Sequence, residues 1–181
     1  MVFSIKKLIF FTAFLAFFIS ASLVFARTVE RVSVSSLGVE GNGGSGGPSI
    51  SSDGRYVSFE SSSTNLVAGD TNAASDIFVY DRNTDTIERV SVSSLGVEGD
   101  GNSTTPSISS DGRYVSFESF ATNLVAGDAN TFRDIFVYDR NTDTIERVSV
   151  SSLGVEGNGG SGGPSISSDG RYVSFESSST N

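Results

Sequence analysis

The sequence predicts an all-β protein built from repeated, four-stranded antiparallel sheets, and three observations support this prediction. A unit of 58 residues recurs along the chain, each complete unit contains four candidate strands, and no window shows the periodicity of an amphipathic helix. The repeat is visible in Glu30–Val34, Glu88–Val92 and Glu146–Val150, and again in Ser52–Phe59, Ser110–Phe117 and Ser168–Phe175.

The N-terminal segment resembles an export signal and divides the chain into a leader and a repeat region. Lys6 and Lys7 precede the apolar run 8–19, and small residues lead to Ala26, where we expect cleavage. An uncleaved membrane anchor over 8–26 is the alternative, because that stretch is just long enough to span a bilayer. The predicted organisation is a signal peptide over 1–26 and an exported repeat region over 27–181, with units 28–85, 86–143 and 144–181.

Composition excludes several classes of function for the repeat region. After the leader there is no lysine, so ten arginines face twenty-one acidic residues and the net charge is near −11. This surface repels phosphate, which argues against nucleic acid and anionic membranes as partners but not against divalent cations. The chain has no Cys and no His, so disulfides, thiolate metal sites and a histidine-dependent catalytic triad are excluded. We therefore predict a protein that is not an enzyme.

Four strands are expected in each unit, at 48–51, 55–61, 77–80 and 86–92 in the first copy. Asp53-Gly54 is a dipeptide typical of a tight hairpin turn. The segment 77–80 is apolar on both faces, as in a strand covered on both sides. Two long loops, 35–47 and 62–75, complete the unit, and we expect glycine-rich 41–47 to be a flexible connector. Four antiparallel strands without a helix are typical of one blade of a β-propeller.

The motif formed by Pro48–Phe59 followed by Asp76–Asp81 resembles the repeat of TolB-type, WD-repeat-like β-propellers. The resemblance covers essentially all of 28–181, although the 58-residue unit is longer than the ~40–45 residues that are usual. It implies a propeller fold. It also implies a choice of roles, because the family includes periplasmic propellers that bind partners and propellers that gate the substrates of serine peptidases.

The strand positions lead to an expectation about ring closure. Residues 28–34 correspond to an outer strand without its three preceding strands, and we expect this strand to clasp the last blade of a ring. Because fewer than four blades are present, we expect either a fragment of a longer protein or self-association of several chains to complete the ring. The predicted function is a secreted or periplasmic scaffold that binds protein or glycan through its loops. The alternative is the propeller portion of a larger secreted hydrolase, of the serine peptidase type, whose catalytic domain lies outside this chain.

One loop motif suggests a metal site. The pattern Asp-x-Asn-x-x-x-Asp occurs twice, and its oxygen-bearing side chains are of the type that calcium prefers. The alternative is that these side chains make turn hydrogen bonds. The candidate calcium ligands are Asp70, Asn72, Asp76, Asp128, Asn130 and Asp134.

The second unit differs from the first mainly in its loops. Phe120, Phe132 and Arg133 stand where the first unit has Ser62, Ala74 and Ser75. Aromatic residues and arginine are enriched at binding hot spots, so we identify these three as candidate binding residues. The alternatives are neutral loop drift, or two phenylalanines that pack on each other.

Overall fold

The computed structural model describes residues 29–181, so the predicted leader and its cleavage site lie outside the described residues. Residues 31–181 form one compact unit. Every regular element in the described part is a β-strand, which confirms the predicted all-β class. In residues 29–181 there is no helix of the length and apolar character needed to cross a membrane.

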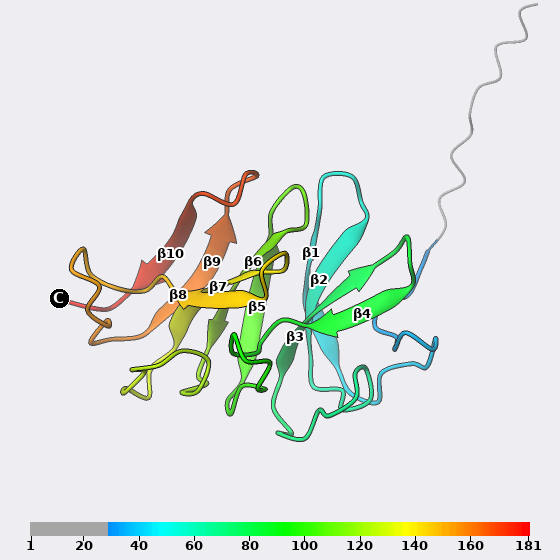
Figure 1. Cartoon of the computed structure of the whole chain (residues 1–181), viewed down its shortest axis with the longest axis horizontal. Coiled ribbons are helices and arrows are strands. Elements are labelled where there is room, and N and C mark those ends of the chain that lie inside the picture. Colours follow the sequence, from blue (N-terminus) through cyan, green and yellow to red (C-terminus); the bar gives the residue numbers. More distant parts are fainter. Residues whose placement is uncertain (1–28) are drawn as a thin grey trace, which may run out of the picture. The chain divides into compact units, whose positions relative to one another are not determined.

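Two complete antiparallel sheets and one two-stranded sheet follow one another along the chain (Figure 1). The first sheet has the strand order β1-β2-β3-β4, the second β5-β6-β7-β8, and the third pairs β9 with β10. This arrangement confirms the prediction of propeller blades. The strands are β1 (Ser45–Ile50), β2 (Tyr56–Ser61), β3 (Asp76–Asp81), β4 (Thr86–Arg89), β5 (Ser103–Ile108), β6 (Tyr114–Ser119), β7 (Asp134–Asp139), β8 (Thr144–Arg147), β9 (Ser161–Ile166) and β10 (Val173–Ser177).

The Asp-Gly turn between β1 and β2 forms as predicted. Asp53 Oδ1 accepts hydrogen bonds from Ser51 Oγ (2.6 Å) and from the Arg55 amide (2.9 Å). Gly54 has φ of 72°, a left-handed conformation in which a side chain is disfavoured. The same turn recurs between β5 and β6 and between β9 and β10, so local sequence is sufficient to place these hairpins.

The core lies on the central strands, because these are covered on both faces as well as paired on both edges. All six residues of β3 are buried, and in β7 only Asp139 is partly exposed. Phe59 on β2 stacks on Phe78 of β3 with ring centroids 5.9 Å apart, and the equivalent rings of the second sheet repeat this distance. Burial of the apolar side chains of these strands stabilises each sheet.

Consecutive sheets pack face to face through residues spaced by one repeat. Strand β5 lies against β1, β2 and β3, and β9 lies in the same way against β5, β6 and β7. At one end of these interfaces the Ser52 amide donates to the Ser110 carbonyl (3.0 Å), and the Ser110 amide donates to the Ser168 carbonyl (3.0 Å). The contacts between sheets therefore repeat as faithfully as the sequence does.

Two sequence-based boundaries are wrong, and so is the expectation of a flexible connector. The predicted loop 35–47 ends early, because β1 begins at Ser45 and is bulged where it pairs with β2. Its glycines are not a free connector, since the Gly43 amide donates to Ser63 Oγ (2.9 Å). The strand expected over 86–92 ends at Arg89, where the Ser91 hydroxyl accepts the Ile77 amide (3.1 Å) and replaces the backbone ladder.

The outer strand expected over 28–34 also does not form. Within its described part, only Val34 makes a bridge, and its partner is Glu40 rather than a neighbouring sheet. The physical reason is the absence of a ladder partner in the described residues, whereas the equivalent β4 and β8 pair with β3 and β7.

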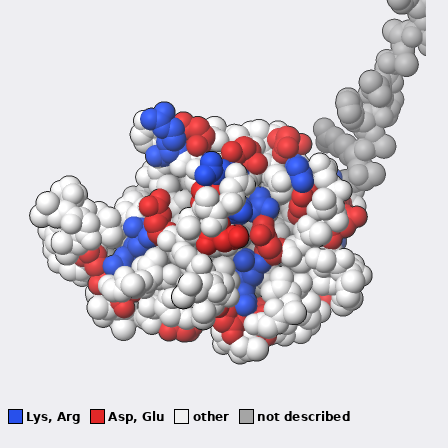
Figure 2. Space-filling model, in the orientation of Figure 1, with Lys and Arg blue, Asp and Glu red and all other residues white. Residues whose placement is uncertain are grey.

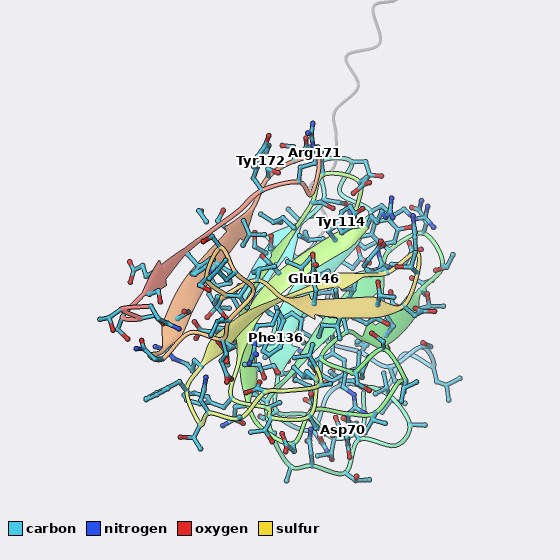
Figure 3. The ribbon with its side chains drawn as sticks, turned by 60° about the vertical axis from the view of Figure 1, so that its left-hand side comes forward. Asp70, Tyr114, Phe136, Glu146, Arg171 and Tyr172 are labelled. Atoms are coloured by element: carbon cyan, nitrogen blue, oxygen red, sulfur yellow. The ribbon has the colours of Figure 1, made fainter. Side chains whose placement is uncertain are left out.

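The two ends of the strands differ in loop length. The short turns lie at one end, where Arg171 and Tyr172 project in Figure 3. The loop 62–75 and its counterparts lie at the opposite end, marked there by Asp70. We call this second end the long-loop end, and both sets of predicted site residues belong to its loops.

Candidate functional site

An arginine at the end of β4 gathers carboxylates from two loops. We define the Arg89 cluster as Arg89, Asp70, Asp76 and Glu98. The Arg89 Nη1 atom lies 2.8 Å from Glu98 Oε2, 3.3 Å from Asp76 Oδ2 and 3.4 Å from Asp70 Oδ1. Because β3 begins at Asp76 and β4 ends at Arg89, antiparallel pairing brings these two side chains to the same end of the sheet.

The cluster is buried and holds more negative than positive charge. The Asp70 side chain is 2% exposed, and its Oδ1 atom has no hydrogen-bond partner in the described residues. Burial raises the pKa of Asp70, and the neighbouring charge of Asp76 adds to the effect. Burial likewise raises the pKa of Asp76, against hydrogen bonds such as the one from Ser91 Oγ (2.5 Å). Three carboxyl groups around one guanidinium are therefore incompletely neutralised.

The second repeat builds an equivalent cluster with one informative difference. The Arg147 cluster contains Arg147, Asp128, Asp134 and Glu156, and the three carboxyl groups lie within 4.8 Å of one another. Burial raises the pKa of Asp128 to about 6, with a hydrogen bond to Glu156 as the next cause. The pKa of Glu156 is lowered, because the hydrogen bond from Asp128 and its other favourable contacts outweigh the effect of burial.

The difference follows from one substitution. In the Arg89 cluster, both the hydroxyl and the amide of Thr71 donate to Glu98, and these bonds lower the pKa of that glutamate. The second repeat has Ala129 at this position, which donates only its amide to Glu156 (3.2 Å). Glu156 therefore lacks the hydroxyl donor that Glu98 has in the first cluster.

The structure thus brings together the carboxylates of each predicted calcium loop. The asparagines serve a different purpose: Asn72 donates to Asp76 Oδ2 (3.1 Å) and to the Gly99 carbonyl (2.8 Å), and Asn130 donates to the Gly157 carbonyl (3.2 Å). Sequence reasoning missed the arginine and the glutamate of each cluster. The sequence does show that this arginine and this glutamate recur in every repeat, but recurrence alone does not reveal that they contact the aspartates. Calcium binding stays a prediction.

The candidate binding residues of the second repeat form a separate site at the long-loop end. Arg133 Nη1 donates to Glu118 Oε1 (2.9 Å), and the guanidinium lies over the Phe120 ring at 5.8 Å from its centroid. Glu118 Oε2 accepts the Gly163 amide of the third sheet (3.0 Å). Phe120 and Phe132 are about half exposed, at 49% and 48%. In the described residues, the ring contact recorded for Phe120 is with Arg133 and not with Phe132.

Arg133 also lines an open cavity of about 480 Å³, whose other lining residues belong to β9, β10 and the residues beside these strands. We call this cavity the Arg133 pocket. It has backbone, hydroxyl and charged groups of both signs on its walls, and no such arginine exists in the first repeat, where Ser75 occupies the position. The lining residues are Arg133, Gly160, Gly162, Gly163, Glu176, Ser177 and Ser178.

The face of the molecule seen in Figure 2 carries interleaved charges of both signs. Figure 2 shows arginine side chains lying beside acidic ones across the visible face. The ion pairs of the described residues include Arg55 with Asp81 (2.7 Å) and Arg140 with Glu88 (2.6 Å). The Arg55 hydrogen bonds lower the pKa of Asp81 to about 2. Most of the described arginines are therefore paired with acidic side chains, which argues against a phosphate-binding patch.

Comparison with known proteins identifies similar solved structures. No family model and no curated protein sequence matches the chain. A TolB protein of Agrobacterium tumefaciens is 21% identical, with a TM-score of 0.48 over 72% of this chain and 37% of its own. TolB of Acinetobacter baumannii is 19% identical, with a TM-score of 0.46 over 75% of this chain and 27% of its own.

A peptidase structure is similar over the same part of the chain. The acylaminoacyl peptidase of Pyrococcus horikoshii is 17% identical, with a TM-score of 0.44 over 72% of this chain and 16% of its own. This chain thus spans well under half the length of each of these three structures. The solved structures similar to this chain thus include two TolB proteins and an acylaminoacyl peptidase.

Proposed function

We propose that this chain is part of an exported β-propeller that acts as a binding scaffold and holds a glycan at the Arg133 pocket. The observation that carries the proposal is the contact between Arg133, Phe120 and Glu118 at the wall of that pocket. The second repeat has an arginine and an aromatic ring where the first has serines, and the fold places these two side chains against each other. A protein partner that packs on the half-exposed phenylalanines is the competing ligand class.

The chemistry of the pocket favours a ligand with many hydroxyl groups. Arg133 offers donors, Glu176 offers acceptors, and Ser177 and Ser178 offer both. The positive charge of Arg133 is already paired with Glu118, so the pocket has no surplus charge to attract an anion. A neutral sugar can donate and accept at each hydroxyl, and the neighbouring Phe120 ring supplies an apolar face.

Replacing Arg133 by serine should abolish glycan binding while leaving the fold intact. Serine is the residue of the first repeat at this position, so the backbone tolerates it. Removal of a hot-spot arginine costs more than about 1.4 kcal/mol of binding energy, which is tenfold or more in Kd. The measurement is binding to an array of neutral and acidic oligosaccharides, followed by calorimetry on the best ligand. Arg171→Ser, at the opposite end, is the matched control.

The outcomes separate the two ligand classes. Binding of oligosaccharides that is lost in Arg133→Ser but kept in Arg171→Ser supports the proposal. No binding to any oligosaccharide, or equal binding by both variants, would overturn it. An effect of Phe132→Ala on a protein partner, without any oligosaccharide binding, would instead identify the protein class.

We also propose that the Arg89 and Arg147 clusters take up calcium. What supports this is the buried Asp70 Oδ1 atom without a hydrogen-bond partner and the excess of carboxyl groups over guanidinium in each cluster. Carboxylate oxygens are the ligands that calcium prefers, and calcium accepts irregular geometry.

Calcium at millimolar concentration should therefore raise the Tm of the purified chain, and chelation should lower it again. The rise should shrink in Asp70→Asn/Asp128→Asn, which removes one carboxylate from each cluster. Differential scanning calorimetry with and without calcium measures the effect, with magnesium as the ionic control because it demands stricter octahedral geometry. An unchanged Tm would count against calcium binding.

A further inference from the structure

Strands β1 and β9 have the same six residues but different burial. Both read Ser-Gly-Gly-Pro-Ser-Ile. In β9 the first, fourth and sixth residues are buried against the second sheet, and in β1 the same three positions are exposed. Ile50 is 57% exposed, whereas its equivalents Ile108 and Ile166 are 7% and 9% exposed. The first sheet therefore presents an uncovered copy of a surface that is covered twice elsewhere.

The third sheet presents the complementary surface. In each internal interface a glutamate accepts an amide of the next sheet: Glu60 Oε2 accepts Thr105 (2.8 Å), and Glu118 Oε2 accepts Gly163 (3.0 Å). Glu176 is the third member of this series and is exposed. Serine side chains repeat the pattern, because Ser49 Oγ accepts the Ile108 amide (3.2 Å) and Ser107 Oγ accepts the Ile166 amide (3.2 Å). The next serine in this series is Ser165.

A tyrosine completes the uncovered surface of the third sheet. Tyr56 lies so close to Gly112 that a Cβ atom there would be 2.1 Å from the ring, and Tyr114 lies equally close to Gly170. Their equivalent, Tyr172, is 66% exposed and projects from the turn before β10 in Figure 3. The glycine of the first sheet that is equivalent to Gly112 and Gly170 is Gly54. Gly54 would therefore be the position that receives a tyrosine from a preceding sheet.

We propose that a second copy of this chain docks head to tail, with the β9–β10 face of one copy on the β1 face of the next. The interface would continue the one already present between the first, second and third sheets, and would use the same residue types at the same repeat positions. Such a contact is heterologous, so it closes into a ring if the rotation per copy allows and otherwise extends as a filament. The docked face includes Glu176, which also lines the Arg133 pocket, so self-association and glycan binding would compete there, whereas calcium binding involves other residues.

Engineered cysteines test the contact directly. The Ser52 and Ser110 hydroxyls are 2.7 Å apart across the first internal interface, and the docked arrangement would place Ser168 of one copy beside Ser52 of the next. The chain has no cysteine of its own. Ser52→Cys/Ser168→Cys should therefore form disulfide-linked oligomers on mild oxidation. Ser52→Cys/Ser110→Cys, as the positive control, should form an intrachain disulfide without covalently linking separate chains.

A second measurement does not depend on disulfide geometry. Sedimentation over a concentration series should show self-association of the unmodified chain, which Ile50→Arg should abolish. Leu95→Arg, at a side chain that is 90% exposed and lies off the proposed interface, should leave it unchanged. A chain that stays monomeric at every concentration, together with an unlinked Ser52→Cys/Ser168→Cys variant when the control pair crosslinks, would overturn the proposal. Such a result would mean that something other than a second copy covers these faces, or nothing does.

Discussion

Replacing Gly112 by alanine should lower the free energy of unfolding far more than the same change at Gly54. The two glycines occupy equivalent turns, before β6 and before β2, with φ of 73° and 72°. Each variant therefore bears the cost of a Cβ atom in the left-handed region, about 1–2 kcal/mol. At Gly112 the new Cβ would also lie 2.1 Å from Cδ2 of Tyr56, and overpacking adds about 1–3 kcal/mol. At Gly54 the nearest heavy atom lies at 3.7 Å.

The difference isolates packing between sheets from local backbone strain. Tyr56 has little room to retreat, because the guanidinium groups of Arg140 and Arg55 lie 4.3 Å and 4.6 Å from its ring centroid. Chemical denaturation of both variants, and of each in a Tyr56→Ala background, gives the coupling energy between the ring and the glycine. Equal destabilisation by the two glycine variants would show that the turn alone, and not the sheet interface, requires glycine at Gly112.

Replacing Arg89, at the end of β4, by methionine should be strongly destabilising. The arginine side chain is 9% exposed, and its removal leaves Asp76 and Asp70 buried without their cation. Loss of one partner from a buried ion pair typically costs about 3–5 kcal/mol, because the remaining charge stays desolvated. Methionine keeps most of the apolar stem, so the loss reports charge rather than volume. Urea denaturation measures the change.

The chain contains a matched control for this effect. Arg31 and Glu40 are the first-repeat equivalents of Arg89 and Glu98, and they form an ion pair of 2.6 Å with both side chains more than half exposed. An exposed pair of this kind contributes about 0–1 kcal/mol, so Arg31→Met should be nearly neutral. If the two variants were equally stable, the Arg89 cluster would be solvated in solution and would not hold buried charge.

This contrast also explains how much of the site the sequence predicts. Glu30-Arg31 and Glu88-Arg89 are identical in sequence, yet only the second arginine meets the aspartates of a β2–β3 loop. The spacing of Asp70 and Asp76 predicted convergence, and the structure agrees. Which arginine lies between these two aspartates depends on which strand pairs with β3, and the local sequence does not contain that information. Glu98 arrives from the segment after β4, twenty-seven residues beyond its partner Thr71.

For the fold, the elements with a strong local signal were predicted well. The Asp-Gly turn and the apolar run 77–80 specify their own geometry, and the structure has β3 over Asp76–Asp81. Residues 45–47 carry no alternation of polar and apolar side chains, so nothing in them predicted a strand. They become one because β2 offers a ladder, which tertiary context supplies. The segment 29–34 is the reverse case, since it has a strand-like sequence without a ladder in the described residues.

The strand β4 belongs to the second sequence unit, although it completes the first sheet. The boundaries of the sequence repeat and the boundaries of the sheets therefore differ by one strand. A recombination event between near-identical units removes or inserts 58 residues wherever the crossover falls. Each event therefore changes the number of sheets by one without creating a broken sheet, because the strand lost at one boundary is replaced by its copy. A gene of this kind can gain or lose whole 58-residue units while every product keeps its strands paired. The number of sheets can therefore change without loss of the fold of each sheet.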